Sequence, residues 1–438
     1  MNPKQNIAII GAGPAGLAMA RALKHEKIPF VIYEKHSGVG GIWDIDNPGT
    51  PMYESAHFIS SKTLSGFPDF PMPDHFPDYP KRQQILEYLK SFADHYALSQ
   101  HIRFDQTIKN IEKQADNTWL LTTQNGEKAQ YDFIICASGP LWHPNTPTYR
   151  GNFEGEVRHA NTYKKAEELI NKRVLVVGGG NSAVDIATEA ATYAAEAHLS
   201  MRRGYYFIPK HIFGQPTDVF AHAGPKLPTK LNQWVLKKLL RMVVGDQTKF
   251  GLPKPDHELM ESHPILNSQI MHHTSHGNLK VKPDVDYFEG KTVFFKDNTS
   301  IEVDLILYAT GYNQQIPYMS NYFDWQDERP QLFLNIFNRK YDNLFVLGFM
   351  ETNSAAYELF TEQDKLLVNY IKAKITSNES AKSFREKVIT EFPDMTGGIK
   401  FLKTARNTGY VDSDTYRAYL LKIQKQLGWT PYKKGFYS

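Results

Sequence analysis

Two glycine-rich turns in this sequence have the composition that binds the pyrophosphate of a dinucleotide. The first is Gly11-Ala12-Gly13-Pro14-Ala15-Gly16, and the second is Gly178-Gly179-Gly180-Asn181-Ser182-Ala183. Glycines let the backbone approach a pyrophosphate, and a helix that begins at such a turn offers unpaired N–H groups and the positive end of its dipole. Two such turns in one chain predict two bound dinucleotides.

The first turn lies inside a complete βαβ pattern. Residues 7–10 predict a strand that ends at the turn, residues 15–25 a helix, and residues 31–33 a second strand. That strand ends at Glu34, followed by Lys35, and a carboxylate at this place can accept hydrogen bonds from ribose hydroxyls. The strand, the helix and the acidic end together indicate a binding site rather than a chance glycine pattern.

The second turn has the same context and a different ending. Residues 174–177 predict a strand, residues 182–196 an alanine-rich helix, and residues 197–201 a strand that ends in Arg202 and Arg203. Guanidinium groups can bind a ribose phosphate that a carboxylate would repel, so this unit is predicted to prefer NADP over NAD. The alternative is that the two arginines form an ordinary solvated pair on the surface.

A third motif lies between the two turns. Phe153, Gly155, His159 and Tyr163 match the pattern F-x-G-x-x-x-H-x-x-x-[YF], the identifying motif of the flavin-containing monooxygenase family. From residue 7 to about residue 370 the chain resembles this family, and the shared segments also include 38–43, 67–71 and 309–312. Tyr163 is followed here by Lys164, whereas Baeyer–Villiger enzymes of similar layout carry Trp followed by Pro or Asp.

The resemblance implies two cofactors, FAD at the first turn and NADPH at the second. The residues expected around FAD are Gly11, Gly13, Pro14, Ala15, Gly16, Glu34, Lys35, Gly40, Gly41, Ile42 and Trp43. Those expected around NADPH are Gly178, Gly180, Asn181, Ser182, Ala183, Arg202 and Arg203. Thr310, Gly311 and Gly348, which follow predicted strands, are further cofactor-binding candidates.

The resemblance also implies an activity. One oxygen atom of O2 would pass, through a flavin hydroperoxide, to a small nucleophile such as an amine nitrogen or a sulfide. The Tyr163–Lys164 ending favours this reaction over the Baeyer–Villiger oxidation of ketones. Three alternatives stay open: that ketone oxidation, an NADPH oxidase that releases hydrogen peroxide, and a non-catalytic flavin-binding or membrane-associated module.

One position departs from the family pattern. An ungapped alignment of residues 53–67 places Ile59 where the family has an asparagine that points at the flavin, and Ile59 cannot donate a hydrogen bond. His57 and Ser60 are the candidate substitutes. His159 either orients a junction near NADP or is simply hydrogen-bonded in a connection. These four residues are the candidate catalytic residues, and no metal site is expected.

Positioning these residues requires an α/β fold with two Rossmann-like dinucleotide-binding domains. Strands predicted at 131–137 and 303–309 end in glycine-containing turns and are interpreted as crossings between the domains, and a strand at 344–349 returns to the first. We therefore predict a discontinuous FAD-binding domain at 1–164 and 301–380, with the NADP-binding domain inserted at 165–300. Residues 381–438 are predicted to form a C-terminal helical extension.

Composition excludes several other classes of protein. The net charge is only +3 over 438 residues, so nucleic acid is not an expected partner. The single cysteine, Cys136, lies in an apolar run and predicts a buried, reduced thiol. One cysteine excludes an intramolecular disulfide and the redox-active pair of a flavin disulfide reductase. The expected partners are a small-molecule substrate and O2, and a homodimer stays open.

No run of residues is apolar enough for a membrane span, and the first predicted strand starts too near Met1 for a cleavable signal. A cytoplasmic protein is therefore expected. Residues 230–244 can form a helix whose apolar stripe lies opposite Lys237, Lys238 and Arg241; the stripe consists of Leu231, Trp234, Val235, Leu239 and Val243. We expect this stripe to pack against the protein's own core or another subunit rather than a membrane surface.

Overall fold

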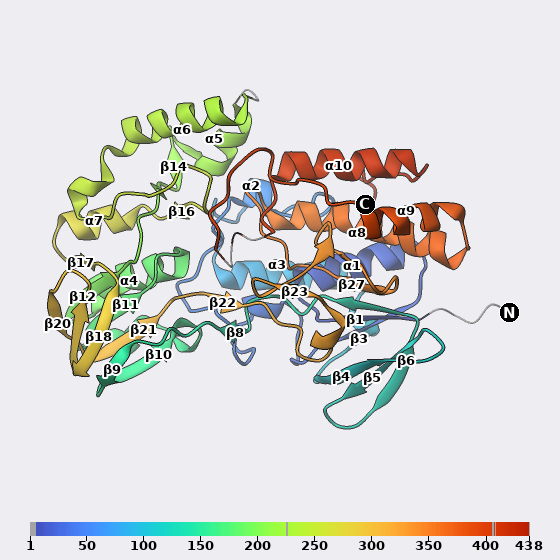
Figure 1. The fold of residues 1–438 in the computed structure, drawn as a ribbon, viewed down its shortest axis with the longest axis horizontal. Coiled ribbons are helices and arrows are strands. Elements are labelled where there is room, and N and C mark those ends of the chain that lie inside the picture. The colour runs from blue at the N-terminus through green and yellow to red at the C-terminus, as the bar shows by residue number, and fades with distance from the viewer. Residues whose placement is uncertain (1–5, 225–226, 405–406, 408, 438) are drawn as a thin grey trace.

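The computed structural model describes residues 6–224, 227–404, 407 and 409–437, which form two lobes, each built on a sheet (Figure 1). The sheet of the first lobe has the strand order β25 (Leu332–Phe333), β26 (Phe337–Asn338), β27 (Leu344–Val346), β7 (Phe133–Cys136), β1 (Ile7–Ile10), β2 (Phe30–Tyr33) and β3 (Ile102–Arg103). From β27 to β3 all neighbouring strands are parallel. The two strands of the first predicted βαβ unit, β1 and β2, are therefore parallel neighbours in this sheet.

Both faces of the first sheet are covered. The α-helices of both lobes, within the described residues, are α1 (Pro14–His25), α2 (Lys62–Ser65), α3 (Arg82–His95), α4 (Asn181–Tyr193), α5 (Thr217–Ala223), α6 (Thr229–Val244), α7 (Gln269–Ser275), α8 (Ala356–Ile375), α9 (Glu379–Thr390) and α10 (Ser413–Gln426). Ile7 and Ile9 belong to the core formed with α1, α3 and α8. Ala8 and Ile10 belong to the opposite core, with the sheet of β4 (Ile108–Lys113), β5 (Trp119–Thr123) and β6 (Lys128–Tyr131). A strand buried on both faces needs the continuous apolar run that β1 has.

The second lobe contains a parallel sheet in the order β10 (Glu156–His159), β21 (Leu305–Tyr308), β11 (Arg173–Val177), β12 (Glu196–Ser200) and β17 (Leu279–Lys282). Helices α4 and α7 contact this sheet. Its other core is shared with the sheet of β20 (Ser300–Glu302), β19 (Thr292–Phe295), β18 (Val285–Gly290) and β9 (Arg150–Phe153). The α/β fold with two Rossmann-like units is therefore confirmed.

The predicted domain boundaries do not follow the strand pairing. Strands β10 and β21 lie on the FAD side of the boundaries at 164 and 301, yet both pair in the sheet of the second lobe. Strand β9 likewise pairs with β18. By strand pairing, the second lobe thus starts before residue 164 and extends past residue 301, because these connecting segments add strands to its sheets. The division into an FAD-binding and an NADP-binding domain stays a prediction.

Short strand pairs complete the connections: β13 (Phe207–Ile208) with β16 (Ile265–Leu266), β14 (His211–Ile212) with β15 (Gln215–Pro216), β8 (His143–Pro144) with β22 (Tyr312–Asn313), and β23 (Trp325–Gln326) with β24 (Arg329–Pro330). In the C-terminal part, α9 and α10 pack on α8. Cys136 is fully buried in β7, and burial raises the pKa of its thiol to about 12. This confirms a core thiol.

Helix α6 contradicts one of its two predicted packing partners, the protein's own core, and leaves packing on another subunit a prediction. Its apolar stripe does not pack into the protein's own core, because Leu231, Trp234, Val235 and Val243 are all exposed and Leu240 is the buried residue of the helix. Figure 1 shows α6 along the outer edge of the second lobe, away from the five-stranded sheet. Across the residues that the structure describes, no helix combines the length and apolar character needed to cross a bilayer.

Candidate functional site

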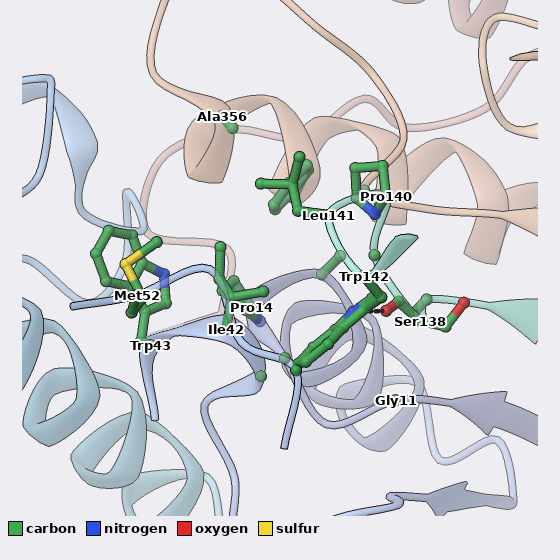
Figure 2. Close-up of a pocket in the computed structure, with 18 of the residues that line it drawn as sticks. Gly11, Pro14, Ile42, Trp43, Met52, Ser138, Pro140, Leu141, Trp142 and Ala356 are labelled. Atoms are coloured by element: carbon green, nitrogen blue, oxygen red, sulfur yellow. Dashed lines mark hydrogen bonds between the residues drawn. The ribbon is translucent and has the colours of Figure 1, made fainter. Parts of the chain in front are cut away.

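A cavity of about 660 Å³ is lined by residues of both lobes. Its wall is formed by the first glycine turn, segments 41–60 and 137–143, the start of α4 and the start of α8. Figure 2 shows part of this wall, including Pro14, Trp43, Met52, Trp142 and Ala356. Small-molecule sites commonly enclose about 300–1,000 Å³, so this cavity can hold a large ligand.

The first glycine turn is shaped by close backbone approach. Gly11 has φ +109°, and a Cβ there would lie 2.6 Å from the carbonyl oxygen of Ala137. A Cβ at Gly16 would lie 2.0 Å from the carbonyl oxygen of Gly11. Helix α1 begins after Gly13, and no side chain caps its N-terminus. The first N–H groups of the helix therefore remain for an anionic ligand in the cavity, which fits a pyrophosphate.

Glu34 lies in the cavity wall at the end of β2 and is almost fully buried. Its Oε2 accepts from the backbone N–H of Ala12 (2.6 Å) and its Oε1 from that of His36 (2.9 Å). Burial raises the pKa of the Glu34 carboxyl, and the two backbone donors oppose this shift. The carboxyl is thus fixed beside the glycine turn, where its remaining acceptor capacity suits ribose hydroxyls.

The second glycine turn carries an unpaired amide. Gly178 has φ +144°, and a Cβ there would lie 2.3 Å from the carbonyl oxygen of Ala309. Asn181 begins α4 and lines the cavity; its Oδ1 accepts from the N–H of Leu266 (3.1 Å), while its buried Nδ2 has no partner among the residues that the structure describes. A buried amide without an acceptor costs about 1–3 kcal/mol, so a ligand acceptor at this position would stabilise the site. This is the fit expected of a second dinucleotide.

The two arginines after β12 differ in their surroundings. Arg203 pairs with Asp256 (Nη2–Oδ2, 3.3 Å) and is half-buried, whereas Arg202 is exposed. Neither lines the cavity. Arg202 is therefore the better placed of the two to meet a ribose phosphate outside the cavity wall.

The cavity brings together many of the predicted cofactor residues. Those in its wall are Gly11, Gly13, Pro14, Ala15, Glu34, Lys35, Gly41, Ile42, Trp43, Asn181, Ser182 and Gly348. Those outside it are Gly16, Gly40, Gly178, Gly180, Ala183, Arg202, Arg203, Thr310 and Gly311. Five of these nine are glycines, which have no side chain to line a cavity.

Three of the four candidate catalytic residues, His57, Ile59 and Ser60, line the cavity. His57 Nδ1 lies 2.7 Å from the carbonyl oxygen of Ser55, and burial lowers the pKa of the imidazole. The neutral ring therefore donates from Nδ1 and keeps Nε2 as an acceptor. Ser60 Oγ accepts from the hydroxyl of Ser65 (2.6 Å).

His159 lies outside the cavity wall. Its Nδ1 accepts from the backbone N–H of Asn161 (3.2 Å), and its Nε2 lies 3.1 Å from the carbonyl oxygen of Gly311. It begins the short turn 160–162 and ties this turn to the segment after β21. This geometry supports the interpretation of His159 as a hydrogen-bonded residue in a connection.

Sequence reasoning missed Asp185 on α4. This residue lines the cavity, and its carboxylate accepts from Tyr53 (Oη–Oδ2, 3.2 Å) and Asn267 (Nδ2–Oδ1, 2.8 Å). Burial raises the pKa of Asp185. A sequence signal existed, since Asn181, Asp185 and Glu189 recur every four residues and so share one face of an alanine-rich helix.

Further contacts join the same parts of the two lobes. Glu189 accepts from the hydroxyls of Ser55 (2.9 Å) and Tyr163 (2.7 Å). Lys164 Nζ donates to the carbonyl oxygens of Thr50 (2.8 Å) and Met52 (3.0 Å). We call these contacts, with the Tyr53–Asp185 bond, the inter-lobe strap. The strap consists of Thr50, Met52, Tyr53, Ser55, Tyr163, Lys164, Asp185 and Glu189, and it holds the cavity wall at 50–57 against the second lobe.

Comparison with known proteins gives a consistent result. The family model described as FMO-like, flavin-binding monooxygenase-like, matches residues 4–428. The chain is also similar to flavin-containing monooxygenase 5 of Cavia porcellus, with 28% identity over 411 residues that cover 87% of this chain and 76% of that protein.

Solved structures share the fold. S-allyl-L-cysteine S-oxygenase from Allium sativum matches with a TM-score of 0.66 and 18% identity over 98% of this chain and 90% of its own. A cyclohexanone monooxygenase bound to ε-caprolactone matches with a TM-score of 0.69 and 18% identity, covering 96% of this chain and 98% of its own. An oxidized steroid monooxygenase bound to NADP matches with the same TM-score of 0.69 and 18% identity, over 96% of this chain and 97% of its own.

Proposed function

The chain, which belongs to the flavin-binding monooxygenase-like family, is an NADPH-dependent oxidoreductase that uses FAD, and we propose that it transfers one oxygen atom of O2 to an amine nitrogen or a sulfide. FAD reduced by NADPH supplies the activation of O2 when it is bound. The N-terminus of α1 and Glu34 hold the first dinucleotide, and Asn181 and Arg202 hold the second. Apolar wall residues such as Trp43 and Phe58 exclude water from the reacting atoms.

The observation that carries the choice of substrate is the end of the motif at Tyr163 and Lys164. The Tyr163 hydroxyl donates to Glu189, and the Lys164 ammonium donates to two carbonyls of the cavity wall. In the ending that the ketone-oxidising enzymes carry, proline or aspartate in place of Lys164 has no ammonium to donate to these carbonyls, and tryptophan in place of Tyr163 has no hydroxyl. The fold alone does not distinguish oxidation of a nitrogen or sulfur atom from oxidation of a ketone, because its structural neighbours include both an S-oxygenase and a cyclohexanone monooxygenase.

The test uses the purified, FAD-loaded enzyme with NADPH, O2 and one of three substrates: trimethylamine, methyl phenyl sulfide or cyclohexanone. NADPH consumption, hydrogen peroxide and oxygenated product are measured together. We expect N-oxide or sulfoxide in proportion to NADPH consumed. Formation of a lactone from cyclohexanone with neither of these products would replace the proposal by Baeyer–Villiger oxidation.

A second candidate, an NADPH oxidase that releases hydrogen peroxide, is favoured by one observation. Ile59 lines the cavity and is 37% exposed, and it offers no hydrogen bond where the family has an amide. In the same experiment, hydrogen peroxide equal to NADPH with all three substrates would support this activity and contradict oxygen transfer.

A further inference from the structure

Helix α6 presents an apolar stripe to solvent. Leu231, Trp234, Val235 and Met242 recur at helical spacing and are 46%, 58%, 37% and 78% exposed. Lys238 lies on this same face, and not opposite it as the sequence pattern predicted, with its Nζ 5.9 Å from the centre of the Trp234 ring. These four apolar side chains, with Lys238 between Val235 and Met242, form a face of α6 that the rest of the described chain leaves uncovered.

The opposite side of α6 is the one that packs on the protein. Leu240 is buried, Gln233 Nε2 donates to the carbonyl oxygen of Leu259 (2.9 Å), and Lys237 pairs with Glu258 (2.7 Å). Thr229 Oγ1 donates to the carbonyl oxygen of Gly397 (2.8 Å). These contacts fix the rotation of the helix, so the exposure of the stripe follows from the packing.

The charge of α6 has a single sign. Residues 229–244 contain three lysines and one arginine and no acidic residue, and Lys230, Lys238 and Arg241 are exposed. We propose that this face of α6 docks on the surface of an anionic lipid bilayer. The apolar stripe lies among the lipid headgroups, and the three exposed cations lie against the lipid phosphates.

The positive charge of this face of α6 favours an anionic bilayer over a second copy of the chain as its partner. A two-fold contact through α6 would place the cations of one copy against those of the other, which is unfavourable in a desolvated interface. The shape also favours a bilayer, because α6 is a single helix along the outer edge of the second lobe (Figure 1), and a flat surface can contact its whole length. Tryptophan with lysine and arginine on one amphipathic helix is the composition expected at such an interface.

The test is co-sedimentation of the FAD-loaded enzyme with vesicles of phosphatidylcholine alone or of phosphatidylcholine mixed with phosphatidylglycerol. We expect binding to the mixed vesicles only, and loss of this binding near 1 M salt, where the screening length is about 3 Å. Equal binding to both vesicles, or binding to neither, would overturn the proposal, and the second result would favour an acidic protein as the partner.

Matched variants separate the two contributions. Lys230→Gln with Lys238→Gln should weaken partition onto the mixed vesicles at least tenfold, since each lysine near an anionic surface contributes about 1 kcal/mol, or about fivefold. Trp234→Glu should abolish partition. Ile389→Glu, which changes an exposed apolar residue of α9, and Lys382→Gln on the same helix should have no effect.

Two controls keep these results interpretable. NADPH consumption without vesicles should be the same in all variants, because none of these residues lines the cavity. Sedimentation velocity tests the competing occupant: a dimer that Trp234→Glu dissociates, together with no vesicle binding, would assign the face to self-association.

Discussion

Near Ile59 the cavity wall offers few groups that can donate a hydrogen bond. His57 uses its Nδ1–H on the carbonyl oxygen of Ser55, and burial lowers the pKa of the ring and so keeps it neutral. Ile59 has no polar atom. Ser60 accepts from Ser65 and can still donate its own O–H, and the Nδ2 of Asn181 has no partner among the described residues. Any polar group that forms during oxygen transfer therefore depends on few donors from the chain.

Ile59→Asn tests directly whether the cavity wall near residue 59 has too few hydrogen-bond donors. One added hydrogen bond to a buried polar group contributes about 0.5–1.5 kcal/mol, so the ratio of hydrogen peroxide released to NADPH consumed should fall about two- to tenfold. Ile59→Val, which changes size without adding a donor, is the control and should leave the ratio unchanged. If the wild-type enzyme releases little peroxide and Ile59→Asn releases more, the alignment of Ile59 with the family asparagine has no mechanistic weight.

Arg202 is the residue on which selection of NADPH over NADH depends in our proposal. Arg202→Ala should raise the KM for NADPH at least tenfold and that for NADH much less, because a hydrogen bond to a charged group contributes about 1.5–3 kcal/mol. Arg203→Ala is the matched variant, and its effect should be smaller, since Asp256 already pairs with this guanidinium. Equal weakening of both cofactors by Arg202→Ala would contradict a role in phosphate binding.

At the scale of elements, helices α8 and α10 share a partly buried carboxyl. Glu362 on α8 accepts from Nε of Arg417 on α10 (3.1 Å), and Arg417 also pairs with Glu358. Burial raises the pKa of Glu362 to about 7, and the attraction of Arg417 only partly offsets this. The folded protein therefore holds a proton at Glu362 between about pH 4.5 and pH 7, where the unfolded chain has released it.

Because the folded state binds this extra proton, Glu362 makes the free energy of unfolding decrease as pH rises from about 4.5 to about 7. Glu362→Gln should remove this contribution, which is at most about 3 kcal/mol over that range. The measurement is urea unfolding of both proteins at several pH values. An unchanged difference between the free energies of unfolding at pH 5 and pH 7 would show that Glu362 is ionised in the folded protein throughout.

The sequence predicted the first and last residues of a helix well where a nearby residue pattern sets them. Helix α1 was predicted at 15–25 and lies at 14–25, since the glycine turn fixes its start. Helix α4 was predicted to end at 196 but ends at Tyr193, because Ala194 is extended and the alanine-rich composition does not mark this change. For α6 the protein's own core was the wrong partner for the apolar stripe, and packing on another subunit stays a prediction, since an amphipathic pattern shows that a helix has an apolar side and not what covers it.

At the scale of the whole molecule, the two lobes are joined across the cavity by the inter-lobe strap. Apart from the Tyr163–Glu189 bond, these contacts connect residues more than 100 positions apart, such as Tyr53 and Asp185 or Thr50 and Lys164. A sequence pattern of local spacing cannot predict such pairs, and for this reason Asp185 and Asn267 were missed although both glycine turns were recognised. The family resemblance identified Tyr163 and Lys164 as the end of the motif, and only the structure shows which groups these two side chains contact.

The strap should matter for the passage of reducing equivalents between the two cofactors, because it sets how the wall at 50–57 lies against α4. Tyr53→Phe and Asp185→Asn should each slow the anaerobic reduction of bound FAD by NADPH, by roughly tenfold, with FAD content unchanged. The double variant should be little slower than either single one, because a shared hydrogen bond gives a coupling energy of about 0.5–3 kcal/mol. Ser55→Ala is the comparison within the strap, since it removes only an exposed bond to the same helix and should change the rate less than twofold. Additive effects of Tyr53→Phe and Asp185→Asn, or a loss of FAD in either, would show that these residues act separately and not as a strap.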